Sequence, residues 1–509
     1  MFFKAILGVL LAIGGFYLFI GIKSVLYPAD VVAATLSENT WWGARRPESV
    51  IDDKIHPFTI TTSASDLEYL RSRLKNTKFP HAPLKEVNFQ YGFNLDYLKL
   101  IRSHWLNNYD WNARLKFLNS LPHFKTTVSG LDVHFIHAKP SLSSTASLKV
   151  IPILMIHGWP GSVREFYDLI PKLVTPRKSV DFVFEVVAPS LPGYGFSEAS
   201  AIQGMATAQM GKFYIHGGDW GSLIGRDMSI AYPQNVLGFH STMCASSDAV
   251  TLGVIMLGSY YPELIVEKED VPRLYPVSKF LHRLYMETGY MHIQATKPDT
   301  VGTALLDSPI GLAAYILEKF SSWTNPAYRN LPDGGLTKKF TLDALLDNVM
   351  IYWTTDSILT SMRLYSEYLS TNYKKLNFDA APVKVPTVCA QFPHELVYSP
   401  PFSLQRKFEK LVKISKFNDG GHFAAFELPD VVANDIWASI PLFIEAHQNA
   451  TILWQVRKKE KKQEVRWENS AGSWVELETF SRGGLEGHLI KEGLKSTKRQ
   501  PMLGDLWES

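Results

Sequence analysis

Short, largely apolar runs recur through the middle of the chain, and each one ends in a turn rich in glycine or proline. Runs without polar alternation are typical of strands that are buried on both faces, as in a parallel sheet covered by helices. The runs that we expect to be strands span residues 150–156, 182–188, 213–216, 387–391 and 412–417. The pattern therefore predicts an α/β fold with a mostly parallel central sheet and functional loops at the carboxyl ends of its strands.

The segments around these runs follow a helical pattern instead. Residues 66–74 and 95–105 place apolar side chains three and four positions apart, which predicts two helices, and residues 130–138 predict one further strand. Residues 251–380 are rich in aromatic side chains and helical patterns, and they interrupt the series of strands. We interpret them as a cap inserted into the sheet domain. The charged run at 457–462 has no sustained period around it, which favours a solvated tail.

The first apolar run differs from the others in length. It extends without a charge from Ala5 to Ile22 and is flanked by Lys4 and Lys23. As a helix, eighteen residues cover most of the ~30 Å hydrocarbon core of a bilayer. A cleaved signal peptide is the alternative, but the run is long for a signal core and no clear small-x-small site follows it promptly. We predict a membrane-spanning anchor helix, whose orientation the balanced lysines leave open.

These patterns divide the chain into predicted parts with different roles. They are a membrane anchor at 1–24, an N-terminal region at 25–148, a core at 149–250 and 381–447, a cap at 251–380, and a divergent, poorly ordered basic tail at 448–509.

Composition narrows the classes of function. The formal net charge is +3, which gives no basis for nucleic-acid binding. The two cysteines, Cys244 and Cys389, match the spacing of no metal motif and no disulfide framework, and this favours a reduced compartment. The 13 tryptophans and 22 tyrosines indicate apolar clefts or an interface in addition to a core.

The strongest chemical signal is the segment GGDWG at 217–221, directly after a predicted strand. It has the form of a nucleophile elbow, in which glycines permit a sharp turn that exposes the central side chain. Here that side chain is the carboxylate of Asp219, which attacks carbon and becomes an ester itself. Suitable electrophiles are epoxides and alkyl halides. The plainer alternative is an aspartate that caps a helix.

Three further segments supply partners for this carboxylate. The segment HGWP offers the backbone N–H of Trp159, which together with that of Trp220 would form an oxyanion hole. His422, in GGHF, follows the last predicted strand and fits the role of the base. Glu395, in FPHE, also follows a strand and can orient His422. Either residue alone would more often be structural, but the order Asp219, Glu395, His422 matches a hydrolase triad.

Longer segments match one family. They are WWG at 41, YGFN at 91, PHFKT at 122, HGWPGS at 157, PSLPGYGFSE at 189, GGDWGS at 217, GYMHIQATKPDTVG at 289, GLAAYILEKF at 311, NVMIYWTT at 348 and GGHFAAFE at 420. Through them the chain resembles the microsomal epoxide hydrolases, from near the anchor to about residue 447. The resemblance implies an α/β-hydrolase fold with a wrapping N-terminal region and a cap over the active site.

The same resemblance implies the activity and its setting. It implies a cytosol-facing enzyme of the endoplasmic reticulum membrane that hydrolyses apolar epoxides, both xenobiotic arene and alkene oxides and lipid epoxides, to vicinal diols. No metal and no cofactor are implied. Two cap tyrosines, Tyr290 in GYMHIQ and Tyr365 after Arg363-Leu364, would hold the epoxide oxygen as it becomes an alkoxide.

Two departures from the family keep other interpretations open. The stretch at 200–212 is too short for the amphipathic helix that precedes the nucleophile strand in the family, so we expect part of the sheet to lose its apolar cover. The basic tail also has no family counterpart. The alternatives are an inactive variant that retains an apolar pocket and a haloalkane dehalogenase. Dehalogenases typically carry asparagine at the position of Trp159, and the tyrosine pair favours an epoxide.

Overall fold

The structure is a computed structural model. It describes residues 40–44, 53–79, 84–141, 148–178, 180–203, 212–246, 248–463, 467–468 and 474–475. The chain forms two compact units, Met1–Ala446 and His447–Ser509, and the site described below lies in the first. The predicted anchor at Ala5 to Ile22 lies outside the described residues.

A nine-stranded sheet forms the centre of the first unit, in the order β1-β2-β3-β5-β4-β6-β7-β8-β9. Its strands are β1 (His56–Phe58), β2 (His123–Val128), β3 (Leu131–Ala138), β4 (Lys149–Ile156), β5 (Phe182–Pro189), β6 (Phe213–Gly217), β7 (Val236–Ser241), β8 (Thr387–Gln391) and β9 (Leu411–Lys416). Strands β1, β2, β3 and β5 pair antiparallel, and all pairs from β5 to β9 are parallel. The predicted mostly parallel sheet is confirmed, although the sequence pattern did not predict β1, β2 and β7.

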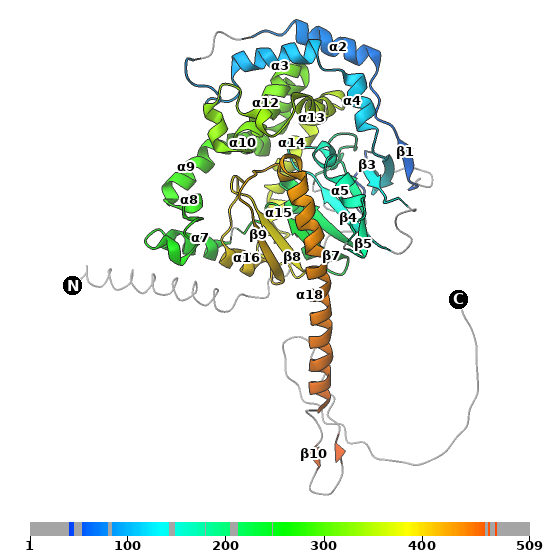
Figure 1. Cartoon of the computed structure of the whole chain (residues 1–509), viewed down its shortest axis with the longest axis vertical. Helices are drawn as coiled ribbons and strands as arrows, with labels where there is room; N and C mark the ends of the chain where they lie inside the picture. Colours follow the sequence, from blue (N-terminus) through cyan, green and yellow to red (C-terminus); the bar gives the residue numbers. More distant parts are fainter. Residues whose placement is uncertain are drawn as a thin grey trace, which may run out of the picture. The chain divides into compact units, whose positions relative to one another are not determined.

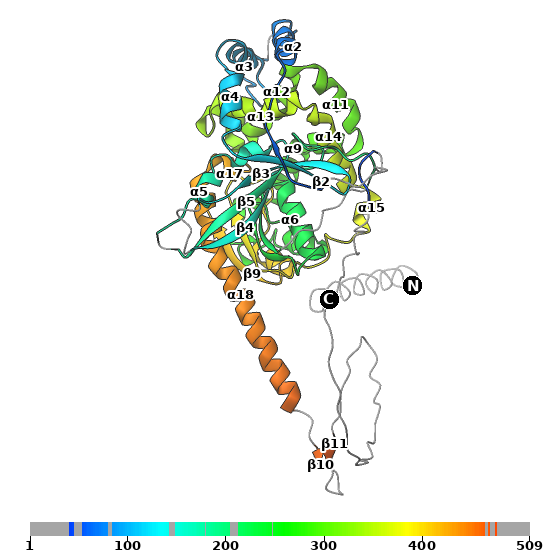
Figure 2. The same cartoon turned by 90° about the vertical axis from the view of Figure 1, so that its right-hand side faces the viewer.

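Helices cover both faces of this sheet (Figure 2). They are α6 (Trp220–Ala231) on one face, and α5 (Ile170–Val174) with the first part of α18 (Pro429–Gln463) on the other. Trp437 of α18 packs against Phe182 and Phe184 of β5, with ring centroids 5.1 and 4.7 Å away. These aromatic contacts explain why the apolar run of β5 lacks polar alternation.

Between β7 and β8 the chain forms the segment that we interpreted as a cap (Figure 1). Its helices are α7 (Ala249–Leu257), η3 (Pro262–Leu264), α8 (Val271–Leu274), α9 (Val277–Glu287), α10 (Gly289–Thr296), α11 (Pro298–Asp307), α12 (Pro309–Ser322), η4 (Pro326–Asn330), η5 (Leu336–Lys338), α13 (Leu342–Thr354), α14 (Ser357–Tyr368) and α15 (Thr371–Lys374). No single helix among the described residues is long and apolar enough to cross a membrane. Only the pair α11 and α12, bent by 119°, reaches that length and apolarity together.

The N-terminal region packs beside the cap as three helices, as Figure 1 shows in blue. They are α2 (Ala64–Lys75), α3 (Leu95–Asn107) and α4 (Trp111–Leu118). Each begins with a polar cap: the side chains of Ser63, Asn94 and Asp110 accept hydrogen bonds from the first free backbone N–H groups. The remaining helices are η2 (Val163–Phe166), α16 (Pro401–Lys407) and α17 (Ala424–Glu427), and the second unit contains the short strands β10 (Trp467–Glu468) and β11 (Trp474–Val475).

The two cysteines form a disulfide, so the expectation that they match no disulfide framework is wrong. Cys244 follows β7, and Cys389 lies in β8, the parallel neighbour of β7. Their Cα atoms are 5.7 Å apart although 145 positions separate them in the sequence. The sequence does not reveal that these two residues are close in space, because the pairing of β7 with β8, and not local geometry, brings them together.

Helix α18 extends to Gln463, so regular structure continues past residue 447 into the segment predicted as a poorly ordered tail. The shortened stretch is only partly visible, because residues 204–211 lie outside the description. On β4, the side chains of Val150 and Pro152 are exposed, Val150 to 41%, whereas Ile151 and Ile153 on the opposite face are buried. Within the described residues, the face of β4 that carries Val150 and Pro152 is thus exposed at the start of the strand, and the expected effect of the short connection stays a prediction.

Candidate active site

The sharp turn between β6 and α6 presents Asp219 at the carboxyl end of the sheet. Asp219 has φ 48° and ψ −123°, a conformation that is costly for a residue with a side chain. Its neighbours allow the turn because they lack side chains. A Cβ on Gly217 would lie 2.3 Å from the carbonyl oxygen of Gly221, and a Cβ on Gly221 would lie 1.8 Å from that of Ile156. The nucleophile elbow predicted from GGDWG is therefore present.

The predicted triad converges from three strand ends. The Nε2 atom of His422 lies 3.3 Å from Oδ2 of Asp219, and its Nδ1 atom lies 2.7 Å from Oε1 of Glu395. Asp219 follows β6, Glu395 follows β8, and His422 follows β9. His422 and Glu395 are each only 4% exposed, so water does not compete for these contacts. The arrangement matches nucleophile, acid and base in a hydrolase triad.

The two carboxylates control the protonation of His422. Burial alone would lower the pKa of this imidazole, but the facing charges of Glu395 and Asp219 outweigh burial and raise the pKa well above its usual value. Loss of the charge on Asp219 would remove one of these influences, lower the pKa of His422 and leave its ring neutral.

The backbone N–H of Trp159 donates a hydrogen bond to Oδ1 of Asp219 over 2.7 Å. Trp220 is the first residue of α6, where backbone N–H groups have no partner within the helix. These two N–H groups were the predicted oxyanion donors, and the structure places Trp159 against the nucleophile itself. Because Oδ1 is held in this way, Oδ2 is the oxygen of Asp219 that is available to attack carbon.

The two predicted tyrosines lie close together above the carboxylate. Tyr290 belongs to α10 and stacks on Trp159, with ring centroids 5.3 Å apart. Tyr365 belongs to α14 and contacts Trp220 edge to face at 4.7 Å. The two phenol rings are 5.8 Å apart. Each tyrosine thus packs on one of the two tryptophans that flank Asp219.

Both phenols keep their protons near neutral pH. Burial, reinforced by the nearby charge of Asp219, raises the pKa of Tyr290 and Tyr365 well above its usual value. The buried hydroxyl of Tyr365 has no hydrogen-bond partner among the described residues. Buried polar groups are normally paired, so an unpaired donor beside a nucleophile indicates a place for a substrate oxygen.

The sequence interpretation missed two glutamates near the site, the partly buried Glu165 and the buried Glu427. Glu165, in η2, lines a small cavity together with Asp219 and His422, and this cavity has room for about one water molecule. Burial raises the pKa of Glu165 to about 8, against the opposing charge of His422, so this carboxyl is protonated at neutral pH and can donate a hydrogen bond. Glu427 accepts the backbone N–H groups of Gly421 and Phe423, on either side of His422. Burial raises its pKa to about 8 as well.

Helix α13 of the cap holds the loop that carries Trp159. Asn348 donates to the carbonyl oxygen of Pro160 and accepts from Ser162, both over 2.7 Å, and the hydroxyl of Tyr352 donates to the carbonyl oxygen of Gly161 over 2.7 Å. Three consecutive loop residues therefore depend on the cap for their hydrogen bonds. The only nearby sequence signal was the HGWPGS segment itself.

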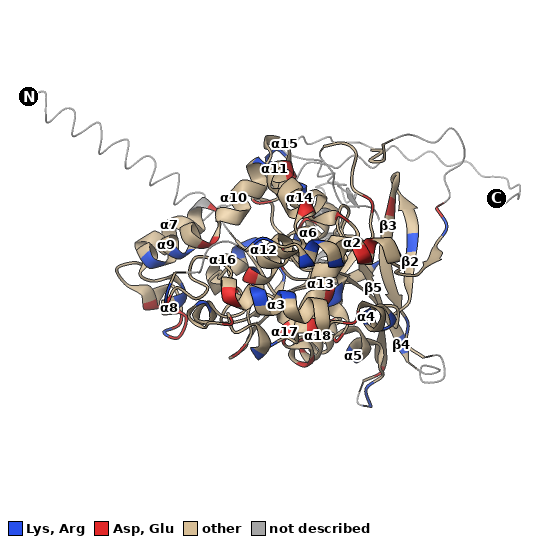
Figure 3. Cartoon of the chain, turned by 90° about the horizontal axis from the view of Figure 1, so that it is seen from above, with Lys and Arg blue, Asp and Glu red and all other residues tan. Residues whose placement is uncertain are grey.

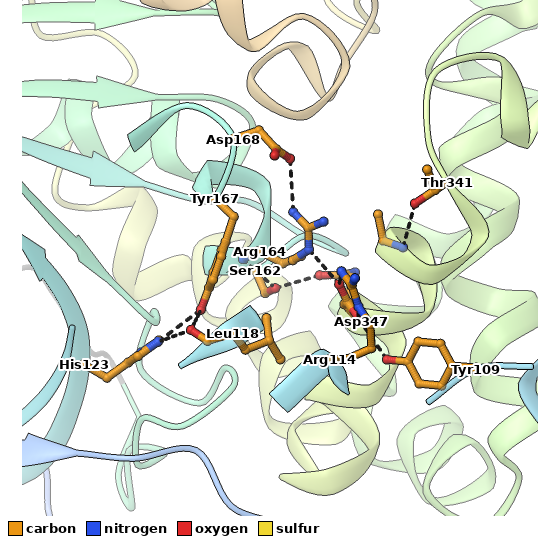
Figure 4. A network of polar contacts seen from close by, with 12 residues as sticks. Tyr109, Arg114, Leu118, His123, Ser162, Arg164, Tyr167, Asp168, Thr341 and Asp347 are labelled. Carbon is orange, nitrogen blue, oxygen red and sulfur yellow. Dashed lines mark hydrogen bonds and ion pairs between the residues drawn. The ribbon is translucent and has the colours of Figure 1, made fainter. Parts of the chain in front are cut away.

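Asp347, the residue before Asn348, joins all three parts of the first unit (Figure 4). Its carboxylate is fully buried and accepts hydrogen bonds from Arg114 Nε at 2.8 Å, Arg164 Nε at 3.0 Å and the hydroxyl of Tyr109 at 2.9 Å. Tyr109 and Arg114 come from the N-terminal region, Arg164 from the loop of the sheet domain, and Asp347 from the cap. One buried anion thus neutralises two cations and links these parts.

The family models and relatives agree with this geometry. Residues 55–166 match the model described as epoxide hydrolase N terminus, and residues 151–375 match the model described as alpha/beta hydrolase fold. The chain is 45% identical to juvenile hormone epoxide hydrolase 2 of Ctenocephalides felis over 84% of this chain and 92% of the relative. It is 45% identical to epoxide hydrolase 1 of Sus scrofa over 78% and 91% of the two chains.

A solved structure supports the same assignment. The crystal structure of juvenile hormone epoxide hydrolase from the silkworm Bombyx mori superposes with a TM-score of 0.78 at 45% identity, and the match covers 81% of this chain and 99% of that one. The triad, the tyrosine pair and these relatives together show that the chain belongs to the epoxide hydrolase family of α/β hydrolases.

Proposed function

We propose that the protein hydrolyses apolar epoxides to vicinal diols through a covalent ester on Asp219. The observation that carries the proposal is the pair of protonated phenols, the partly buried Tyr290 and the buried Tyr365, beside the carboxylate of a hydrolase triad. An epoxide oxygen leaves only if a donor stabilises its developing negative charge, and two phenols supply that stabilisation. A halide needs no proton, so the pair favours an epoxide over an alkyl halide.

The first half of the reaction forms the ester. The Oδ2 atom of Asp219 attacks one epoxide carbon, the C–O bond of that carbon breaks, and the oxygen takes a proton from the tyrosine pair. The hydrogen bond from Trp159 to Oδ1 holds the carboxylate plane during the attack. The product is a hydroxyalkyl ester of Asp219.

The second half hydrolyses this ester. His422, held by Glu395, removes a proton from a water molecule, and the resulting hydroxide adds to the ester carbonyl carbon of Asp219. The backbone N–H groups of Trp159 and Trp220 then stabilise the negative charge on the carbonyl oxygen. Collapse of this intermediate breaks the ester bond and regenerates the carboxylic acid of Asp219. The departing alkoxide takes the proton from His422, which completes the diol, and the proton of the carboxylic acid returns to the tyrosine pair.

Trapping the ester tests the proposal directly. A His422→Ala variant retains the nucleophile but lacks the base, so an excess of styrene oxide should leave a stoichiometric mass increase on the peptide that contains Asp219. An Asp219→Ala variant, with the same fold by circular dichroism, should show no increase. Folded His422→Ala protein that gains no mass would contradict the covalent mechanism. Halide release from 1-bromobutane without diol formation from styrene oxide would favour a dehalogenase instead.

The substrate class follows from the aromatic surroundings of the site. Tyr290 contacts Trp159 and Trp323, and Trp159 also contacts Tyr315, so a substrate held by Tyr290 lies among aromatic rings. Some relatives are named for juvenile hormone and others simply epoxide hydrolase 1, and these names do not converge on one molecule. We therefore propose apolar epoxides as a class, including arene and alkene oxides of xenobiotic origin and lipid epoxides, which makes detoxification a plausible setting.

The proposal extends to the location of the enzyme. The apolar run from Ala5 to Ile22 supports a single-pass anchor in the endoplasmic reticulum membrane. The family resemblance, and not the run itself, implies a catalytic unit on the cytosolic side. The disulfide between Cys244 and Cys389 favours the opposite side, because disulfides persist in oxidising compartments such as the reticulum lumen. Carbonate extraction of microsomes tests the anchor. Protease digestion of sealed microsomes decides the orientation, since a cytosolic catalytic unit is cleaved without detergent.

A further inference from the structure

An apolar surface includes exposed residues of α7, of η3 after it, and of α9. Figures 1 and 3 show α7 and α9 at the same end of the first unit, with α8 between them in Figure 1. We call it the α7–α9 surface. The residues that define it are Leu257, Tyr260, Tyr261, Leu264, Tyr285 and Met286, and each is between 58% and 83% exposed. Single exposed apolar residues are common on proteins, but a cluster of this size marks a site of interaction with another molecule.

These side chains are not an unpacked core, because the same helices have a core of their own. Ile255, Leu274, Tyr275 and Val277 are buried together with Tyr398 from the loop after β8. The hydroxyl of Tyr275 donates a hydrogen bond to the carbonyl oxygen of Ile255 over 3.0 Å, which ties α7 to the start of α9. The α7–α9 surface is therefore the outer side of a folded element, where a partner can replace water without unfolding it.

Charge is sparse on this surface. No charged residue occurs from Ala249 to Pro262, so covering this stretch removes no ion from water, and the exposed Glu263 of η3 follows it directly. The nearest acidic cluster is largely compensated, since Lys416 lies 2.8 Å from both Glu267 and Asp270. Figure 3 shows α7 without red or blue and α9 with a blue segment. Leucine, methionine and tyrosine beside an uncharged stretch are the side chains that enter the headgroup region of a bilayer.

The tether of the chain is long enough for a lipid partner to reach this surface. The backbone N–H of Trp42 donates to the carbonyl oxygen of Ser129, so the chain already contacts the sheet domain at this point. Only 17 residues separate Lys23, which ends the apolar run, from residue 41. Fully extended, they span about 60 Å. A bilayer that holds Ala5 to Ile22 therefore lies within reach of any surface of a domain of this size.

The α7–α9 surface also adjoins the active site along the chain. Helix α9 ends at Glu287, and α10 begins at Gly289 and carries Tyr290. We infer that the α7–α9 surface docks into the lipid headgroup region, so that the helix with the oxygen-binding tyrosine lies beside the phase in which apolar epoxides dissolve. This inference rests on the proposed function for the nature of the substrate, but the docking itself is measurable without turnover.

Single-cysteine labelling tests the docking. Both native cysteines are in the disulfide, so a Leu257→Cys or Tyr285→Cys variant of the full chain offers one thiol for an environment-sensitive nitrobenzoxadiazole dye. The control is Leu100→Cys on α3, outside the α7–α9 surface, where the native side chain is 62% exposed. In phosphatidylcholine vesicles with spin-labelled acyl chains, we expect quenched, blue-shifted emission at 257 and 285, and unquenched, water-like emission at 100.

Two other outcomes would overturn the inference. Dyes at 257 and 285 that remain accessible to aqueous iodide and insensitive to the spin-labelled lipid would show that the surface stays in water. Dyes shielded from both quenchers would show that protein covers the surface. Dependence of that shielding on the ratio of protein to lipid would then identify a second copy of the chain, and independence would identify a segment of the same chain.

A kinetic measurement separates this inference from the proposed function. In vesicles, a Leu257→Glu/Leu264→Glu variant should raise the KM for 1,2-epoxydodecane at least about tenfold, which corresponds to the loss of one buried leucine. Its kcat/KM for water-soluble 1,2-epoxypropane should not change, because neither leucine lies in the active site. An unchanged KM for the long epoxide would contradict docking. Absence of diol from both epoxides in the parent chain would contradict the proposed function and leave the dye experiment valid.

Discussion

The two halves of the active site are built in different ways. On the sheet side, Asp219, Glu395 and His422 each follow a strand directly, and the strand ends meet because parallel neighbours share one edge. On the cap side, Tyr290 and Tyr365 lie on helices that meet only because α10 and α11 pack against α14. Nucleophile chemistry therefore depends on a local turn, whereas donation to the epoxide oxygen depends on helix packing between distant segments.

Because the two halves serve different steps, kinetics can distinguish their contributions. Substitution of the cap tyrosines should give the largest change in rate. A Tyr290→Phe/Tyr365→Phe variant retains the triad but loses both donors, so we expect the rate of ester formation to fall by about 10²- to 10⁴-fold. Stopped-flow fluorescence of the active-site tryptophans measures that rate. The rate of ester hydrolysis should change far less. An equal fall in the rates of both steps would mean that the cap tyrosines also contribute to hydrolysis by the triad.

The junction between the halves should control stability. Asp347→Asn leaves Arg114 and Arg164 without their buried counter-charge, and we expect a loss of about 3–5 kcal/mol in the free energy of unfolding. Urea denaturation measures it. The matched control is Asp307→Asn, which removes the exposed partner of Arg73 between the cap and the N-terminal region and should cost no more than about 1 kcal/mol. Similar losses in the two variants would show that the Asp347 network is not a special link.

On the sheet side, Glu395→Gln should alter the pH dependence of hydrolysis. Glu395 helps to raise the pKa of His422, and His422 acts as a base only when neutral, so the hydrolysis rate rises with pH through that pKa. Removing the carboxylate charge lowers the pKa, and the acidic limb of kcat should move to lower pH by about one unit or more. The maximal rate should fall because the ring loses its orienting partner. If the acidic limb stayed at the same pH in the variant, a group other than His422 would be responsible for it.

Glu165→Gln should give the smallest effect, confined to alkaline pH. The pKa of Glu165 is about 8, so in the parent enzyme a hydrogen-bond donor is lost and a negative charge appears beside Asp219 as the pH rises through that value. We expect a few-fold fall in kcat/KM between pH 7 and 9 in the parent. Glutamine is neutral throughout, so the variant should lack this fall. Glu427→Gln is the control, because Glu427 has the same raised pKa but binds backbone N–H groups around His422.

Much of the fold and most of the site were predictable from local pattern. The apolar runs 150–156, 182–188 and 387–391 correspond to β4, β5 and β8 with changes of one residue at most. Such runs can be predicted as strands because a strand buried on both faces has no polar alternation. The edge strand β1 and its neighbour β2 lack that signal, since most of their residues remain partly in water.

The sequence by itself determined the nucleophile and its chemistry. An elbow needs glycine at positions 217 and 221 whatever surrounds it, because any side chain there would overlap the backbone of a neighbouring turn or strand. Tyr290 and Tyr365 came only from the family resemblance, since their spacing along the chain carries no periodic signal that points to a shared site. The tertiary structure alone decided the contacts that depend on packing between distant segments. They are the Cys244–Cys389 disulfide, the Asp347 network, the positions of Glu165 and Glu427, and the exposed α7–α9 surface.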